Sequence, residues 1–334
     1  MRRRILIISP AGPRDNNGNW QTASRWARFL HGHCHVEVAR DWSEQGPVPD
    51  LLIALHARRS AAAMAAFTAR HPDRPSVLVL TGTDLYRDIA IDANAQASLH
   101  HAHALVLLQP AGLALLPDPM QAKAHVIYQS APSLRPHAPS PNARHRDICM
   151  IGHLREEKDP LTFIRAASLV TAPGAHLLHI GGALDPALGA AAEQAESPRY
   201  HWLGALPHAA ARQRLKRCHA KAITSKMEGG ANVIIEAVTS GVPVLASDIS
   251  GNRGMLGEDY RGYFPPGDAA ALARLIDRSI MDPDFDALLR RQCAARARLF
   301  APTAEQAALC DLVDNLLLHA PGATTNMENH DEHD

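Results

Sequence analysis

The sequence lacks an excess of charge of either sign, because 34 Lys and Arg residues balance 34 Asp and Glu residues in a chain of 334. A protein whose main partner is nucleic acid normally carries a basic footprint, so this balance argues against that function. A balanced total charge still allows local basic patches, which could bind a phosphorylated small molecule. The hydrophobic content of 46% is that of a globular protein, and the length predicts two domains, since one core rarely grows further.

The sequence also lacks a long apolar run, which argues against a transmembrane helix. The first residues, Met1–Arg4, are basic like the start of a signal peptide, but the apolar stretch Ile5–Ile8 is too short for one. We therefore expect a first buried strand here, a cytoplasmic protein and no stable association with a membrane.

No C-x-x-C motif is present, and the five cysteines are odd in number and scattered. This pattern indicates reduced thiols rather than a disulfide framework or a zinc site. The groups His31–His35 and His100–His103 contain metal-ligating residue types, but without a second ligand cluster we interpret them as surface histidines. The Asp-x-Asp pattern in Asp282–Asp286 follows an expected late helix, far from any strand end, so we expect no metal there.

Short apolar segments alternate with helical patterns along the first half of the chain. Such alternation is typical of a parallel, doubly wound α/β sheet. The expected strands are Ile5–Ser9, His35–Ala39, Leu51–Leu55, Val77–Leu80, Leu105–Leu108 and His125–Tyr128, with helices at Trp20–Leu30 and Ser60–Arg70.

A proline-rich segment, Ser130–Asn142, can continue neither helix nor sheet and predicts a linker. The alternation then restarts, which predicts two Rossmann-like domains facing each other across a cleft. The second set of strands is expected at Asp147–Ile151, Ala175–Ile180, Tyr200–Leu203, Lys221–Thr224, Val242–Ala246 and Gly262–Phe264, with helices at Pro160–Thr171, Ala209–Cys218, Ala231–Ser240 and Ala269–Asp282. We assign residues 1–140 to an acceptor domain, 141–300 to a donor domain, 301–319 to a helix packing back on the first domain, and 320–334 to a disordered tail.

Two carboxylates flank a glycine pair in Glu228-Gly-Gly-Ala-Asn-Val-Ile-Ile-Glu236, between an expected strand and helix. Gly229 and Gly230 allow a ligand to approach the backbone closely. Free N–H groups at the helix start would favour a phosphate; they belong to Gly230, Ala231, Asn232 and Val233. Carboxylates accept hydrogen bonds from sugar hydroxyls, so one acid could hold a ribose and the other a hexose. The alternative is an ordinary strand–helix unit with a surface glutamate.

A second loop, Ile151–Pro160, also follows a strand and opens a helix, with Pro160 at the first helical position. Arg155 and Lys158 in this loop would neutralise a diphosphate leaving group. The alternative is a solvated, charged turn.

Loops after the first-half strands supply candidates for acceptor binding. The amides in Asp15–Ala23 suit ligand hydrogen bonds, although an Asn/Gly turn is the plain alternative. The basic residues after Leu55 begin a helix against its dipole, which favours a role in holding an anionic acceptor. The candidates are Asn16, Asn17, Asn19, His56, Arg58, Arg59, Thr81, Thr83 and Asp84.

The Glu-x7-Glu spacing of Glu228 and Glu236 resembles that of retaining GT-B glycosyltransferases of the GT4 type. The resemblance implies a GT-B fold, with Glu228 on the donor sugar and Glu236 on the nucleotide ribose. It also implies that no cofactor or metal is needed, because this family uses Arg, Lys and helix N-termini instead.

Further loops match this family in part. Lys158 matches a diphosphate-binding lysine, whereas His153 stands where the family has Arg, and Arg155 lies two residues on. Gly18 matches a glycine near the donor phosphates, and Thr81 replaces a histidine often found near the reacting sugar.

These departures resemble the selenosugar synthase family of selenoneine biosynthesis. The resemblance covers nearly all of residues 4–300 and rests on the order and spacing of N-N-G-N-W-Q-T-A, L-H-A-R-R-S, L-T-G-T-D-L-Y-R-D, Y-Q-S-A-P, G-H-L-R-E-E-K-D-P-L, I-G-G-A-L-D, W-L-G-A-L-P-H and M-E-G-G-A-N-V-I-I-E-A. It implies a C–Se bond formed between selenophosphate and a UDP-sugar, with UDP-N-acetylglucosamine favoured, and catalytic roles for Lys158, Arg155 and Glu228. Selenium enters only through this resemblance. The partners that the resemblance implies are small-molecule substrates, without nucleic acid.

Two further functions remain open. A conventional O-glycosyltransferase would act on a sugar, lipid or small metabolite; a lipid acceptor would need a basic amphipathic helix, for which Trp20–Leu30 is the candidate. A catalytically silent protein would bind a UDP-sugar without releasing UDP. The anomeric outcome, the donor hexose and the oligomeric state also stay open.

Overall fold

The structure is a computed structural model that describes residues 2–15, 17–137 and 145–319, and the chain divides into two units. Unit 1 comprises Met1–Tyr128 and Thr303–Asp334, and unit 2 comprises Gln129–Pro302. The expected tail, 320–334, and the later part of the expected linker lie outside the described residues. The described part of that linker, 130–137, contains neither helix nor strand.

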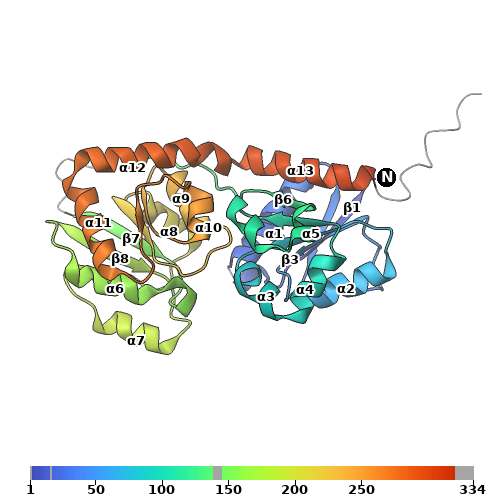
Figure 1. Cartoon of the computed structure of the whole chain (residues 1–334), viewed down its shortest axis with the longest axis horizontal. Helices are drawn as coiled ribbons and strands as arrows, with labels where there is room; N and C mark the ends of the chain where they lie inside the picture. Colours follow the sequence, from blue (N-terminus) through green and yellow to red (C-terminus); the bar gives the residue numbers. More distant parts are fainter. Residues whose placement is uncertain (1, 16, 138–144, 320–334) are drawn as a thin grey trace, which may run out of the picture. The chain divides into compact units, whose positions relative to one another are not determined.

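Unit 1 contains a six-stranded parallel sheet with the order β2-β1-β3-β4-β5-β6 (Figure 1). Its strands are β1 (Arg4–Ile8), β2 (His35–Ala39), β3 (Leu51–Leu55), β4 (Ser76–Leu80), β5 (Ala104–Leu107) and β6 (Ala124–Val126). Its helices are α1 (Gly18–Leu30), α2 (Ala61–Arg70), α3 (Ile89–Ile91), α4 (Ala93–His101), α5 (Asp118–Gln121) and α13 (Pro302–Leu318).

Both faces of this sheet are covered, which explains why its strands are almost continuously apolar. Successive side chains of a strand point to opposite faces, so Ile5 and Ile7 enter one core while Leu6 and Ile8 enter the other. The first core includes Trp26 of α1 together with apolar residues of α13; the second includes Phe67 of α2.

A buried ion pair joins α13 to α1 within unit 1. The carboxylate of Glu305 accepts hydrogen bonds from Arg25 Nε (2.7 Å), Arg25 Nη2 (3.0 Å) and Trp26 Nε1 (2.7 Å). Arg25 and Trp26 of α1 are therefore buried and not available to a membrane surface, contrary to the lipid-acceptor alternative.

Within the described ranges, no helix is both long and apolar enough to span a membrane.

Unit 2 contains a second six-stranded parallel sheet, with the order β12-β11-β10-β7-β8-β9. Its strands are β7 (Arg146–Ile151), β8 (Ala175–Ile180), β9 (Tyr200–Trp202), β10 (Ala220–Ile223), β11 (Val244–Ser247) and β12 (Tyr263–Phe264). Its helices are α6 (Pro160–Leu169), α7 (Pro186–Gln194), α8 (His208–Leu215), α9 (Asn232–Val238), α10 (Ser250–Leu256), α11 (Ala269–Met281) and α12 (Pro283–Arg296).

The expected α/β class with two doubly wound sheets is confirmed, and each of the twelve expected strands overlaps a strand of the structure. The Asp-x-Asp pattern belongs to the start of α12, a helix that the sequence patterns missed. Asp282 caps this helix by accepting from Phe285 N (3.0 Å), and Asp284 and Asp286 lie in its first turn. Acidic residues are stabilising there because they oppose the positive end of the helix dipole.

The order of strands reverses once in each sheet, between β1 and β3 in unit 1 and between β7 and β10 in unit 2. At such a point the loops leave the two adjacent strands toward opposite faces, and a crevice opens at the carboxyl ends. The ligand site of each unit is therefore expected in the loops after these strands.

Candidate active site at the carboxyl ends of the strands

The loop after β7 turns sharply before α6. Asp159 adopts a left-handed conformation (φ 44°) and its carboxylate accepts from Thr162 Oγ1 at 2.6 Å, while Pro160 occupies the first turn of the helix as expected. Lys158 immediately precedes this turn, so the backbone fixes the point from which its side chain extends.

The loop after β10 is hydrogen-bonded to the loop after β7. Lys226 N donates to Glu157 O (2.9 Å), and Thr224 Oγ1 donates to Lys158 O (2.8 Å). These bonds hold the two loops together at the point where the strand order reverses.

Lys158 and Glu228 meet between these loops. Glu228 Oε1 accepts from Lys158 Nζ at 2.5 Å and from Ser225 Oγ at 2.5 Å. The Glu228 side chain is 9% exposed and that of Lys158 is 17% exposed, so the pair lies in a half-sheltered position that still reaches solvent. No hydrogen bond from the described residues reaches Glu228 Oε2, which leaves that oxygen as an acceptor for a ligand.

Backbone donors follow Glu228. The N–H groups of Gly229, Gly230, Ala231, Asn232 and Val233 find no acceptor within the described part of the chain. The first turn of a helix leaves such groups unsatisfied, and they can donate to an anion. The helix itself begins at Asn232, one residue later than expected.

Glu236 is positioned by a residue to which the sequence assigned no role. His208, the first residue of α8, places Nε2 2.6 Å from Glu236 Oε1, and this hydrogen bond raises the pKa of His208 above its ordinary value. The Glu236 side chain is 11% exposed. The sequence contained the signal W-L-G-A-L-P-H208, but nothing in it indicated that the histidine contacts the second glutamate.

His153 and Arg155 lie at the edge of this site. His153 Nδ1 accepts from Gly182 N (3.0 Å), which fixes the ring against the loop after β8. Arg155 is exposed and makes no ion pair with the described residues, so its guanidinium is available to a ligand. That Arg155 takes the role of the family arginine, whose place His153 occupies, stays a prediction.

Lys221 is a second feature that the sequence did not reveal. It lies inside β10 with no exposed surface, and its Nζ donates to Ala222 O. Burial lowers its pKa to about 8, and both Lys158 and Glu228 are close enough to influence that value. A fully buried, charged lysine within electrostatic reach of Glu228 adds positive potential near the site.

In unit 1, Asp84 organises the loops after β3 and β4. Its carboxylate accepts from the backbone N–H groups of Ala57 (3.0 Å), Thr81 (2.9 Å) and Gly82 (2.7 Å), and its side chain has no exposed surface. Both oxygens are thus used to join the two loops, and a contact of Asp84 with an acceptor stays a prediction.

The basic group after β3 is less cationic than its composition indicated. His56 is buried, burial lowers its pKa, and its Nε2 lies 3.3 Å from Thr83 Oγ1. Arg58 pairs with Asp88 at 2.9 Å. Arg59 is exposed and makes no ion pair with the described residues, so it is the cation of this group most available to an anion. Thr81 is half-buried beside these loops.

The amide-rich loop after β1 has a structural role at one position. Asn17 caps α1 by accepting from Trp20 N at 3.2 Å, and Gly18 is the first helical residue. Asn19 lies half-buried in the first turn, and Asn16 lies outside the described residues. Among the residues that the structure describes, no group of His, Cys, Asp or Glu could hold a metal ion.

Three comparisons relate the chain to known proteins. Residues 137–300 match the model of the family Glycosyl transferases group 1. A stretch of 61 residues is 39% identical to Protein CapJ of Staphylococcus aureus; it is 18% of this chain and spans only 15% of that protein.

Solved structures resemble the chain over almost its whole length. HepE of Anabaena in complex with UDP and glucose has a TM-score of 0.73 at 18% identity, covering 94% of this chain and 100% of that one. Sucrose-phosphate synthase of Thermosynechococcus elongatus has a TM-score of 0.75 at 17% identity, covering 94% and 99%. These likenesses confirm the GT-B fold class.

Proposed function

We propose that this chain, whose second unit belongs to the glycosyl transferases group 1 family, transfers a sugar from a UDP-sugar donor to a small acceptor. The donor is held by the loops after β7 and β10 of unit 2. The acceptor is held by the loops after β1, β3 and β4 of unit 1. The donor sugar is N-acetylglucosamine and the acceptor is selenophosphate.

The observation that carries the donor assignment is the contact between Lys158 and Glu228 where the strand order of unit 2 reverses. A nucleotide sugar needs cations for its diphosphate and oxygen acceptors for its hydroxyls. Lys158 and exposed Arg155 provide the cations, and Glu228 Oε2 provides an acceptor for the hexose. Glu236, held by His208, accepts from the ribose hydroxyls.

In the transfer step, the bond between C1 of the sugar and the diphosphate oxygen breaks, and UDP leaves with the electron pair. Lys158 stabilises the developing charge together with the unsatisfied N–H groups that follow Glu228. A solved structure of HepE is described as a complex with UDP-glucose, which supports UDP as the nucleotide here.

The acceptor assignment rests on the residues of unit 1. A selenium nucleophile is soft and largely ionised near neutral pH, so it attacks C1 without a strong general base. This is consistent with threonine at position 81, where the GT4-type glycosyltransferases often carry a histidine near the reacting sugar, and with a His56 ring whose pKa is lowered by burial. Exposed Arg59 suits the phosphate of the acceptor.

The test is to incubate the protein with UDP-N-acetylglucosamine and selenophosphate, and to follow UDP release and a selenium-containing product by mass spectrometry. We expect both, in equal amounts. UDP release with hydroxyl acceptors alone would replace selenophosphate with a conventional O-glycosyltransferase acceptor. Binding of the donor without UDP release for any acceptor would overturn the enzyme assignment altogether.

A further inference from the structure

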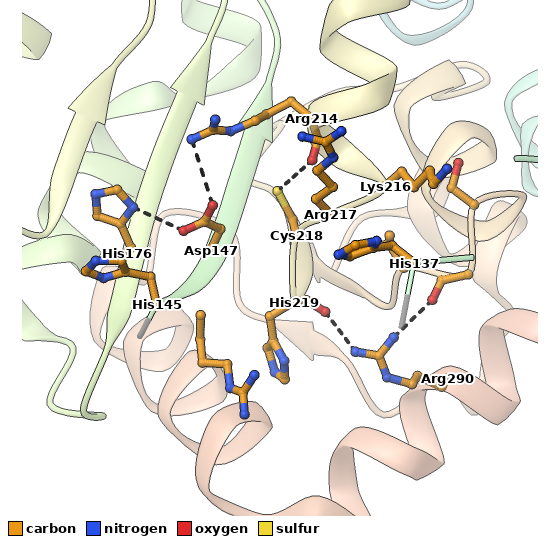
Figure 2. Close-up of a pocket in the computed structure, with 14 residues that line it drawn as sticks. His137, His145, Asp147, His176, Arg214, Lys216, Arg217, Cys218, His219 and Arg290 are labelled. Carbon is orange, nitrogen blue, oxygen red and sulfur yellow. Dashed lines mark hydrogen bonds and ion pairs between the residues drawn. The ribbon is translucent and has the colours of Figure 1, made fainter. Parts of the chain in front are cut away.

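A cavity of about 360 Å³ opens in unit 2 at the opposite edge of the sheet from the donor loops. It is lined by the first residues of β7 and β8 and by the residues just before β10 and β11, all at the amino ends of the strands. Figure 2 shows side chains from α8 and α12 approaching the same space. Small-molecule sites occupy about 300–1,000 Å³, so the cavity has the size of a ligand site.

The lining is strongly basic, although the whole chain carries no net charge. Among the described residues that line it, Asp147 is the single carboxylate. It faces five permanent cations and four histidines; the cations are Arg146, Arg214, Lys216, Arg217 and Arg290. A cavity lined by one sign of charge concentrates the field and attracts ions of the opposite sign.

Three of these cations have no counter-charge among the described residues. Arg146, Lys216 and Arg217 make no ion pair with any residue that the structure describes, whereas Arg214 lies 3.8 Å from Asp147 and Arg290 lies 2.8 Å from Asp286. Like charges gathered in one place repel each other, and a bound anion would relieve that repulsion.

The cavity is also preorganised. Arg290 is held by Gly241 O (3.0 Å) and His219 O (3.1 Å) in addition to Asp286, so its guanidinium is fixed at the rim (Figure 2). Asp147 is held by His176 at 3.1 Å. These bonds fix two residues of the lining, so this part of the cavity wall needs no ordering when a ligand binds.

Stabilisation of the helix dipole does not account for this arrangement. Lys216 and Arg217 follow the end of α8 and could interact favourably with its carbonyls, but that end carries only about half a negative charge. Arg146 comes from β7 and Arg290 from α12, and both line the same cavity. Separate elements that direct cations to one space indicate a site for a ligand.

We propose that this cavity binds a small anion that carries two or more phosphate groups. Three unpaired cations match a ligand with several negative charges, and Arg and Lys are the side chains that bind phosphate most strongly. A concave site of about 360 Å³ suits a small molecule, whereas a nucleic acid needs an extended basic stripe.

The site is separate from the donor loops. Arg146 begins β7 and Ile151 ends it, so about 16 Å of strand separates the two edges of the sheet. The proposal therefore does not depend on the proposed transferase activity. An anion bound here leaves the loops around Lys158 and Glu228 free.

The probe is inorganic tripolyphosphate, titrated into the full chain by calorimetry. We expect saturable binding that weakens about tenfold or more when three cations are neutralised together, in the variant Arg146→Gln/Lys216→Gln/Arg217→Gln. A matched control removes three exposed cations that make no ion pair with described residues elsewhere in unit 2, as Arg165→Gln/Arg261→Gln/Arg274→Gln.

The control variant should bind within about twofold of the parent. The variant Lys158→Ala should retain full affinity, because the donor loops are not part of the site. Circular dichroism and thermal unfolding establish that each variant is folded.

Three outcomes would overturn the proposal: no saturable binding by the parent chain, equal weakening in the control variant, or loss of binding in Lys158→Ala. Tighter binding of a single-stranded RNA oligonucleotide than of tripolyphosphate would overturn the small-molecule assignment.

Discussion

Lys158 Nζ lies 2.5 Å from Glu228 Oε1, although the two residues are separated by 70 positions in the chain. The contact brings the loop after β7 against the loop after β10, and the hydrogen bonds donated by Lys226 N and Thr224 Oγ1 support it. A cation and a carboxylate with a free oxygen are thereby fixed side by side at the carboxyl edge of the sheet.

The variant Glu228→Gln keeps the shape of this side chain but removes the charge. We expect kcat/KM for the UDP-sugar to fall about 10²–10³-fold, because the group would no longer accept fully from the hexose or orient Lys158. UDP release under steady-state conditions measures it. The control is Lys226→Gln in the same loop, whose exposed pair with Glu156 spans 3.6 Å; its effect should stay within about twofold. Equal losses in both variants would contradict the role of Glu228.

The contact between His208 and Glu236 predicts pH-dependent binding of UDP. The hydrogen bond to Glu236 raises the pKa of His208, so the charged pair is complete below the ordinary histidine pKa and is lost as pH rises through the raised value. We expect UDP affinity to fall about two- to tenfold between pH 6 and pH 9, because the neutral pair orients Glu236 less firmly.

The variant His208→Gln still donates a hydrogen bond but does not titrate. Its UDP affinity, measured by calorimetry over the same range, should lose most of this pH dependence. A profile parallel to that of the parent chain would show that another group is responsible.

Much of this architecture could be predicted from the sequence. The strands were visible because both faces of each sheet are covered, so β3 and β4 are continuous apolar runs such as Leu51–Leu55. Lys158 and Glu228 were visible because they lie in loops that lead from a strand to a helix, and Glu236 because of its spacing from Glu228. Such local features can be predicted from the sequence pattern alone, because they do not depend on how distant segments pack together.

Contacts across the fold could not be predicted in the same way. The residues after His208 indicate a helix, but they do not show what the His208 side chain contacts. Its contact with Glu236 depends on how α8 packs beside α9. The burial of Lys221 could not be predicted, because the pattern of polar and apolar residues in its strand does not show that both faces of the sheet are covered. Asp84 looked like a ligand-binding acid, but its oxygens are satisfied by backbone N–H groups from two loops.

Gly181 and Gly152 approach each other so closely that a side chain at Gly181 is excluded. A Cβ atom there would lie 1.9 Å from Gly152 O. We expect Gly181→Ala to lower the free energy of unfolding by about 3 kcal/mol, because the obstacle is backbone and cannot rotate away. Urea denaturation measures this value. The matched variant Gly152→Ala meets only Lys158 Cγ at 3.7 Å, an ordinary contact, and should be almost neutral; a similar loss there would refute the argument.

The hydrogen bonds of Glu305 to α1 help to hold α13 in place on unit 1. Its carboxylate is buried and accepts three hydrogen bonds from Arg25 and Trp26. We expect Glu305→Gln to destabilise the protein by about 3–5 kcal/mol, since it leaves the Arg25 charge buried without a partner. Thermal unfolding checks this, with exposed Asp311→Asn on the same helix as the control, expected within about 0.5 kcal/mol. Equal stability of both variants would contradict the role of the buried pair.

His179 predicts a loss of stability in mild acid. It lies inside β8 with no exposed surface, and burial lowers its pKa to about 4. The unfolded chain therefore binds a proton between pH 6.5 and pH 4 that the folded chain does not, so this contribution to stability is complete above pH 6.5 and is lost as pH falls toward 4. The shift corresponds to about 3 kcal/mol.

Urea denaturation of the parent chain and of His179→Asn at several pH values isolates this effect, because Asn does not titrate but can still hydrogen-bond Tyr200 Oη, which lies 3.0 Å from His179 Nδ1. The difference in unfolding free energy between the two proteins should shrink by about 3 kcal/mol from pH 6.5 to pH 4. The exposed His125→Asn serves as the control and should leave the profile unchanged. A constant difference across this range would show that His179 has the same pKa in the folded and the unfolded chain, and would refute this prediction.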